Sequence, residues 1–175
     1  MIQARSEMGL GFVVKWVIAV AVGNILMLLV TYGVMFVLGQ TEGIWGSPIL
    51  RLIVITGLGA LAGALFGSAE AYPLVRYIAH PDHWIVATAA GMAIGLLGNL
   101  IIADKFVSDL MLGATVGVFQ WLVLRNEVSQ AGWWIPAHII AMQLKAGTIL
   151  LGVLLLIVFR RTSTTVNAES PAAAR

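Results

Sequence analysis

The chain has 175 residues, of which 60% are hydrophobic and only 10% are charged. Soluble domains carry about 25% charged residues, so this composition excludes an ordinary soluble domain and indicates a protein whose solvent is lipid. The net charge of +2 comes from few groups and indicates no nucleic-acid partner, and the lack of cysteine excludes disulfides, thiolate metal sites and a cysteine nucleophile.

Five apolar segments separated by polar turns predict five membrane-spanning helices. A bilayer requires roughly 17–25 residues per span, and the uninterrupted apolar part of the fourth segment begins only at Leu110, which leaves that segment short. Residues 162–175 are rich in Ser, Thr, Ala and Pro and predict a disordered tail. We therefore expect an all-α polytopic bundle over residues 1–161, with spans at about 12–38, 49–75, 84–103, 107–124 and 133–159.

The polar run between the second and third spans predicts a turn. It reads His80-Pro81-Asp82-His83 and could offer a metal ion two imidazoles and one carboxylate. Pro81 restricts the turn, and no further ligand is near in the sequence. A solvated interfacial loop is therefore the favoured interpretation, with a metal site at His80, Asp82 and His83 as its alternative.

A repeat of about fifty residues relates the second and third spans to the fourth and fifth. A half copy opens the chain, since Trp16, Ala19 and Gly23 match the start of the third span. Such a pattern predicts a duplicated helical hairpin that packs against copies of itself. The repeated positions are Gly63, Gly67, Glu70, Leu74, Trp84 and Ala87, which recur as Gly113, Gly117, Gln120, Leu124, Trp134 and Ala137.

Small residues at four-residue steps predict close helix packing. Lipid offers no hydrophobic drive between helices, so small residues on one face let backbones approach and gain dispersion contacts. The three-step ladder in the second span is expected to face a helix of the same chain. The predicted packing positions are Gly59, Gly63, Gly67, Gly91, Gly95, Gly113 and Gly117.

Four tryptophans are predicted to enter the membrane at one face. Trp16, Trp84, Trp133 and Trp134 each stand where a second-half helix begins. This position is typical of an aromatic belt at the membrane interface, which we favour over a role in stacking on a cofactor.

Four polar side chains are predicted to meet inside the bilayer. Glu70 and Gln120 are repeat equivalents and lie at one depth, His138 follows Trp134 by four residues, and Lys145 lies deeper. Because side chains lean toward the N-terminus of their own helix, Glu70 and Lys145 lean toward one another and predict an ion pair. A satisfied internal cluster that fixes helix register is favoured over a polar cavity for a solute or a proton.

No catalytic signature accompanies this cluster. His138 could serve as an axial ligand to haem or a chlorin, but a lone intramembrane histidine favours a hydrogen-bonded helix contact, so no cofactor is predicted. The sequence contains no Ser/His/Asp set, P-loop or zincin motif, and we expect a protein that is not an enzyme.

The second repeat resembles a group of small uncharacterised bacterial membrane proteins. Residues 113–125 read GATVGVFQWLVLR and are followed by Gly132, two tryptophans and Ala137, which matches tandem GxxxGxxQWLVLR…GWWxxA units. The resemblance implies a bacterial cytoplasmic membrane protein and no particular activity. This chain departs from the pattern at Glu70, Ala71, Ala141 and Lys145, which suggests a specialised member.

Membrane orientation follows from the resemblance, because the charges do not decide it. Alternating spans place four basic residues on the N-terminal side and five on the other. In the resembling proteins the arginines after each repeat lie in the cytoplasm, which implies a cytoplasmic N-terminus here. The two sets are Arg5, Lys15, Arg76 and Arg125 on one side, and Arg51, Lys105, Arg160, Arg161 and Arg175 on the other.

Short loops, glycine faces and the lack of a reaction site predict a non-catalytic accessory or scaffold subunit of a larger bacterial membrane complex. Its expected partners are the lipid bilayer and other membrane subunits. The alternative is a small carrier or binding module that handles a solute or a proton near Glu70 and Lys145.

Overall fold

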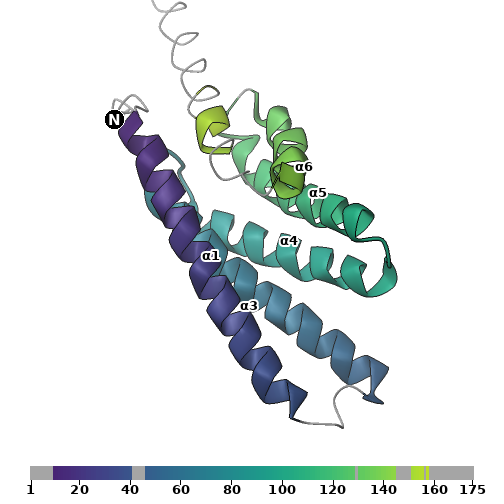
Figure 1. Cartoon of the computed structure of the whole chain (residues 1–175). Coiled ribbons are helices and arrows are strands. Elements are labelled where there is room, and N and C mark those ends of the chain that lie inside the picture. Colours follow the sequence, from purple (N-terminus) through teal and green to yellow (C-terminus); the bar gives the residue numbers. More distant parts are fainter. Residues whose placement is uncertain (1–9, 41–45, 129, 145–150, 156, 158–175) are drawn as a thin grey trace, which may run out of the picture.

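The computed structural model describes residues 10–40, 46–128, 130–144, 151–155 and 157, and its described elements are all helical, as predicted (Figure 1). Four of the helices are long and apolar enough to cross a membrane, as in a multi-pass membrane protein. These four are α1 (Leu10–Gly39), α3 (Pro48–Leu74), α4 (Pro81–Ile101) and α5 (Lys105–Leu124). A 3-10 turn, η1 (Ala131–Trp133), leads into α6 (Trp134–Leu144).

Polar residues before α3 and α5 cap the starts of these helices. Ser47 and Asp104 are N-caps whose side chains accept hydrogen bonds from the backbone N–H groups of Leu50 and Val107. Pro81 occupies the first turn of α4, where proline is tolerated because its missing N–H would have no partner. The predicted turn at residues 80–83 is therefore wrong in part, since only His80 precedes the helix.

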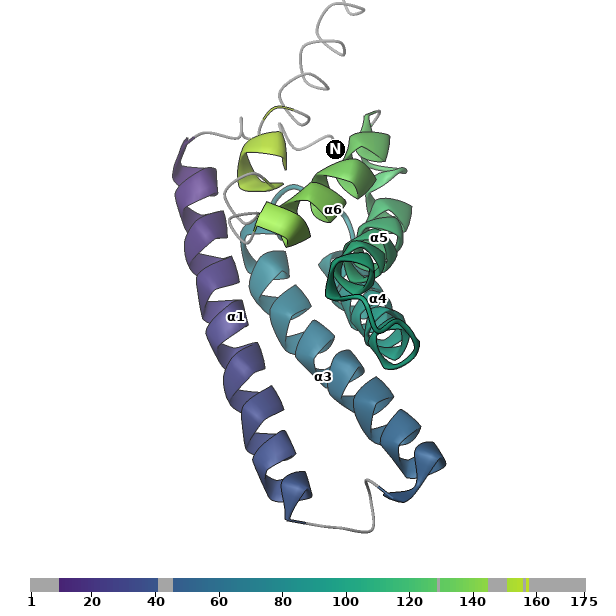
Figure 2. The ribbon, with the colours of Figure 1, turned by 45° about the vertical axis from the view of Figure 1, so that its right-hand side comes forward.

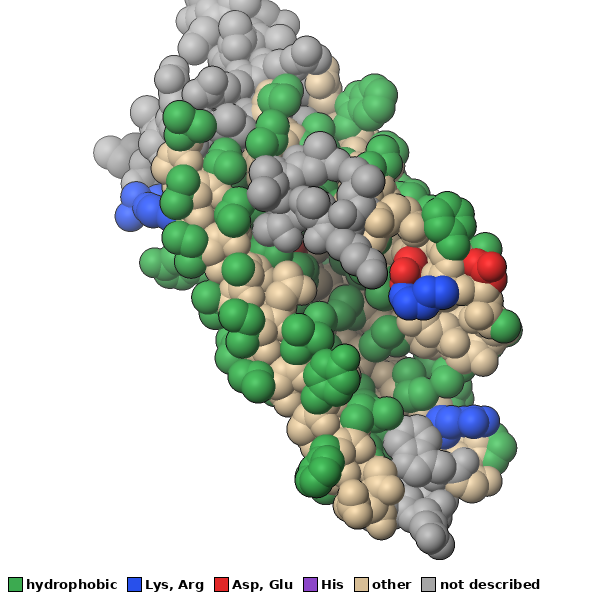
Figure 3. Space-filling view, viewed as in Figure 1, with side chains coloured by type: hydrophobic (Ala, Val, Ile, Leu, Met, Phe, Trp, Pro, Cys, Tyr) green, Lys and Arg blue, Asp and Glu red, His purple; other side chains and the backbone are tan. Residues whose placement is uncertain are grey.

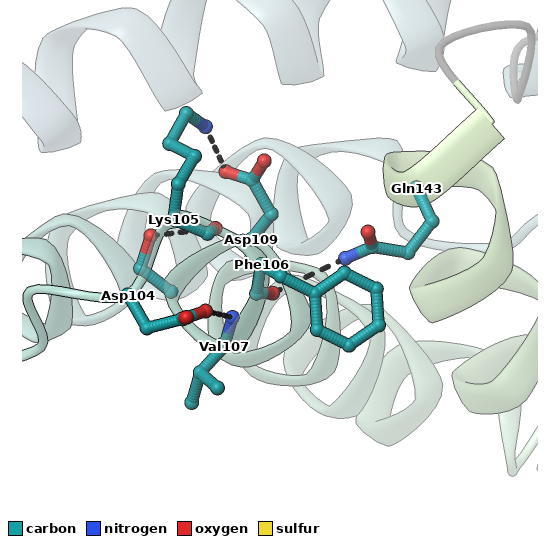
Figure 4. Close-up of polar contacts among 7 residues, drawn as sticks. Asp104, Lys105, Phe106, Val107, Asp109 and Gln143 are labelled. Atoms are coloured by element: carbon teal, nitrogen blue, oxygen red, sulfur yellow. Dashed lines mark hydrogen bonds and ion pairs between the residues drawn. The ribbon is translucent and has the colours of Figure 1, made fainter.

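Helix α5 is longer than its apolar sequence indicates. The N-cap residue Asp104 starts the helix at Lys105. Lys105 and Asp109 form an ion pair one helical turn apart, so their opposite charges compensate each other (Figure 4). The 20 residues of α5 reach about 30 Å, the thickness of a hydrocarbon core. The short fourth segment is thus long enough to span.

Replacement of the α5 cap should weaken the start of that helix. Asp104→Ala removes the acceptor that lies 2.9 Å from the Val107 backbone nitrogen, and we expect a loss of about 1 kcal/mol in the free energy of unfolding. Unfolding in mild detergent, followed by circular dichroism, measures it. Asp109→Ala is the matched control, because it removes an ion pair with the largely exposed Lys105 and should cost less. Equal losses in both variants would contradict the capping role.

The fifth span is not one straight helix. Trp134 at the start of α6 lines the same small cavity as Leu154 and Leu155. A straight helix would place Trp134 and Leu155 about 30 Å apart at 1.5 Å per residue. The predicted continuous span over 133–159 is therefore wrong. Residues 151–155 pack beside Trp134 at the start of α6, whereas a straight helix would place them far from it.

Consecutive helices pack against one another, and the larger of two buried clusters lies at one end of the molecule. The core gathers the starts of α1, α4 and α6 with the ends of α3 and α5, around Trp16, Trp84 and Trp134. Beyond Gly23, α1 contains no buried residue among those described, and neither does the stretch 46–57. Figure 2 shows α1 and α3 separating toward the C-terminal end of α1 and the N-terminal end of α3.

The outer surface is apolar. Figure 3 shows hydrophobic side chains spread along one face and only a few charged side chains, which lie toward its edges. Exposed leucine, isoleucine, valine and phenylalanine side chains follow α1 along most of its length. A surface of this kind requires lipid as its solvent. The predicted tail at 162–175 lies outside the described residues.

Candidate functional site: a buried polar layer between tryptophans

Glu70 forms the first half of a polar layer inside the helix bundle. It stands near the end of α3 and is 1% exposed. Its Oε2 atom accepts hydrogen bonds from Trp84 Nε1 at 3.0 Å and from Gln120 Nε2 at 2.8 Å. Two donors to one buried carboxylate oxygen offset much of the cost of removing that oxygen from water.

Gln120 forms the second half and connects four helices. Its Nε2 atom also donates to Thr88 Oγ1 at 2.9 Å, and its Oε1 atom accepts from Trp134 Nε1 at 2.9 Å. The Thr88 hydroxyl in turn donates to the backbone carbonyl of Trp84. Every polar atom of the Gln120 side chain is thus engaged, by partners on α3, α4 and α6.

The two halves use the same contact fifty residues apart. The tryptophan fourteen residues after Glu70 donates to Glu70, and the tryptophan fourteen residues after Gln120 donates to Gln120. Only Gln120 also reaches back to the preceding hairpin, at Glu70 and Thr88. The layer is therefore a chain of contacts that runs from α3 through α5 to α6.

The aromatic-belt interpretation is wrong for three of the four tryptophans. Trp16, Trp84 and Trp134 are buried, and their rings contact each other edge to face, with centroids 6.4 Å apart for Trp16 and Trp134 and 5.7 Å apart for Trp84 and Trp134. The indole N–H groups of Trp84 and Trp134 have interior acceptors, so they need no interfacial water. Trp133 is exposed, as a belt residue would be.

His138 borders this layer but does not join its hydrogen bonds. It is 4% exposed, it packs beside the Trp134 ring, and its Nδ1 atom has no hydrogen-bond partner among the described residues. Glu70 Oε1 is the other buried side-chain atom without such a partner. The structure brings Glu70 and Gln120 together, while Lys145 lies outside the described residues and its pairing with Glu70 remains a prediction.

The sequence interpretation missed the partners that hold the layer. Thr88 is not among the four polar side chains predicted to meet in the bilayer, and the predicted aromatic belt places Trp84 and Trp134 at the interface. The fourteen-residue spacing from Glu70 to Trp84, repeated from Gln120 to Trp134, could have identified them. One helix end, a turn and the next helix start separate each pair, which returns the indole to the depth of its acceptor.

The predicted packing glycines set the spacing of the helices around the layer. A Cβ atom placed on Gly63 would lie 2.7 Å from Ala89 Cα and 2.7 Å from Thr88 O on α4. One placed on Gly91 would lie 2.7 Å from Val116 Cα on α5. In the same way, Gly59 and Gly67 face α4, Gly95 faces α5, and Gly113 and Gly117 face α6.

The glycine contacts also recur fifty residues apart. Gly63 faces residues 88, 89 and 92, and Gly113 faces residues 138, 139 and 142. Gly67 faces residues 85 and 88, and Gly117 faces residues 135 and 138. The α3–α4 and α5–α6 contacts therefore have one register, and both bring a tryptophan to the same polar position.

A small cavity lies beside Trp134. The cavity beside Trp134, lined among others by Leu124, Val128 and Leu155, has a volume of about 10 Å³. That volume is close to the minimum for a single water molecule.

The predicted metal ligands His80, Asp82 and His83 lie outside the core. They are exposed at the start of α4, with ligand atoms within 4.8 Å of one another.

The chain matches no protein-family model, no curated protein and no solved structure.

Proposed function

We propose that the chain is a non-catalytic accessory or scaffold subunit of a larger bacterial membrane complex, built from two copies of one helical hairpin and a half copy. The observation that supports the proposal best is a second small-residue face on α3. The first face, which includes Gly59, Gly63 and Gly67, is covered by α4. The second remains at the surface, where a helix of a partner subunit fits.

This second face, the outer face of α3, follows steps of three and four residues. Gly57 and Ser68 are exposed, and Ala60 and Ala64 are half-buried. A Cβ atom on Gly57 would meet no atom within 4 Å. The Ser68 hydroxyl donates to the Ala64 carbonyl of its own helix at 2.7 Å, so its polarity is already satisfied. Small residues with satisfied polar groups favour close approach of a second helix.

The polar layer supports a structural role for the interior. Hydrogen bonds between its own side chains occupy Gln120 completely and occupy one oxygen of Glu70. A buried network of this kind fixes the register of the helices that contribute to it. Register in turn determines which residues the outer face of α3 presents to a partner.

Purification from native membranes tests the proposal. The tagged chain is extracted in mild detergent, and the co-purifying membrane proteins are quantified by mass spectrometry. We expect Gly57→Leu to lower recovery of the partner at least about tenfold, because a bulky side chain blocks backbone approach. The variant should keep its own stability, since the space beside Gly57 is open.

The control for this experiment is Gly11→Leu. Gly11 is also in open space, but it lies at the start of α1, away from the outer face of α3. The Gly11→Leu variant should recover the partner as well as the unaltered chain does. Equal recovery from Gly57→Leu and the unaltered chain would overturn the proposal, and so would the lack of any membrane protein that depends on the tagged chain.

A proton-handling role is the second candidate, and one observation favours it. Glu70 Oε1 and His138 Nδ1 are the two buried side-chain atoms of the described residues without a hydrogen-bond partner. Buried titratable groups with spare hydrogen-bonding capacity are typical of proton pathways.

A further inference from the structure

We propose that His80, Asp82 and His83 form a binding site for a divalent transition-metal ion of the zinc class. The three residues lie at the junction of α3 and α4, and each offers one ligand atom, all within 4.8 Å of one another. Two ligands on a tetrahedral zinc ion, each about 2.0–2.2 Å from the metal, lie about 3.4 Å apart. Side-chain rotations that also unstack the two imidazoles bring the three atoms into a coordination sphere.

The two imidazoles are neighbours, and each must rotate for both ring planes to point at one ion. The rings of His80 and His83 stack with centroids 4.7 Å apart and planes inclined by 26°. His83 Nε2 lies 3.8 Å from Asp82 Oδ2. His80 is the N-cap residue of α4, but its side chain makes no capping hydrogen bond, so capping does not occupy its ring nitrogens.

The backbone that carries these ligands is held on both sides. Ile78 before them and Trp84 after them are buried in the core. The Ala79 N–H donates to Glu127 Oε1 at 3.3 Å, which ties this junction to the turn after α5. Pro81 restricts the backbone between the two histidines. A site on a fixed backbone pays less conformational entropy on binding a metal than a site on a free loop.

The second hairpin shows that the turn itself does not need these side chains. Its corresponding residues are Gln130, Ala131, Gly132 and Trp133, and none of them is a histidine or a carboxylate. The backbone bonds are nevertheless the same, since His83 N donates to His80 O at 3.2 Å and Trp133 N donates to Gln130 O at 3.2 Å. The ligand set is therefore an addition to the first hairpin, separate from the folding of the turn.

The donor set determines which ion binds. Two imidazole nitrogens and one carboxylate oxygen suit Zn²⁺, Co²⁺ or Ni²⁺, whereas Mg²⁺ and Ca²⁺ prefer oxygen ligands throughout. Three protein ligands leave at least one position for water or another group. All three side chains are exposed, so the ion reaches the site from solvent.

Metal titration of the purified chain tests the site. The full chain, carrying a tag without histidines, is stripped with a chelator, and Zn²⁺ binding is measured by competition with a chromophoric chelator. Co²⁺ binding is followed by its visible ligand-field absorption. We expect one equivalent per chain, with binding unaffected by excess Mg²⁺. The double variant His80→Gln and His83→Gln should bind at least about tenfold more weakly, because first-shell ligands are lost.

Two controls separate this site from other donors. His138→Gln removes the only other histidine, which is buried, and should leave binding unchanged. Asp109→Asn removes a carboxylate near the start of α5 and should also leave binding unchanged. Circular dichroism verifies that each variant keeps its helices. Unaltered Zn²⁺ affinity in the folded double variant would overturn the proposal, as would displacement of Zn²⁺ by equal Mg²⁺.

Discussion

Replacing Gln120 with glutamate is expected to lower the free energy of unfolding by about 2–4 kcal/mol. The substitution puts an oxygen where Nε2 now lies 2.8 Å from Glu70 Oε2 and 2.9 Å from Thr88 Oγ1. The amide N–H groups between the two side chains are lost, and two carboxyl groups face one another in a buried layer. Reversible unfolding in mixed micelles measures the change.

The exchange of the two residues provides the sharper test. In the double variant Glu70→Gln and Gln120→Glu, one amide again faces one carboxyl group, and the side chain at 120 can still accept from Trp134. The atom at 70 that now meets both Trp84 and Gln120 can either donate to the new carboxyl group or accept from Trp84. Part of the lost stability should therefore return, which a double-mutant cycle records as a coupling energy. Additive losses would show that the two residues act independently.

Gln143→Glu is the matched control for this chemistry. Gln143 is half-buried on α6, and its only described hydrogen bond is a 3.4 Å contact with the Phe106 carbonyl (Figure 4). The same change of amide to carboxyl should cost less than about 1 kcal/mol there. A loss as large as that of Gln120→Glu would mean that the polar layer has no special role.

Replacing Gly63 with alanine is expected to destabilise the chain by about 1–3 kcal/mol through overpacking. The new methyl group would lie 2.7 Å from Ala89 Cα and from Thr88 O, and both are backbone atoms that cannot move without shifting α4. The shift would also displace Thr88 from Gln120. Leucine at this position should cost more. Unfolding in detergent, with helix content followed by circular dichroism, gives the magnitude.

Gly57→Ala is the control on the same helix. A Cβ atom on Gly57 meets no atom within 4 Å, so the only effect is the higher helix propensity of alanine. We expect stability to stay the same or to rise by about 0.5–1 kcal/mol. Similar losses at Gly57 and Gly63 would indicate a general effect of glycine replacement and would contradict the packing role of Gly63.

The sequence by itself determined the helical class, the apolar surface and most helix ends. Long apolar segments interrupted by Ser47-Pro48, His80-Pro81 and Asp104 leave few choices, because a backbone in lipid must satisfy its own hydrogen bonds and only capped helices do so locally. The glycine steps identified the packing faces for the same reason, since small residues on one face of a helix have few other uses in a membrane.

Only the tertiary structure decided which way the polar and aromatic side chains face. Depth along a helix follows from residue number, but direction depends on the neighbouring helices. Trp84 and Trp134 have the depth of belt residues and nevertheless turn inward, because Glu70 and Gln120 present acceptors there. The position of Leu155 in the core beside Trp134 was likewise beyond the sequence, since an apolar segment of this length also suits one straight span.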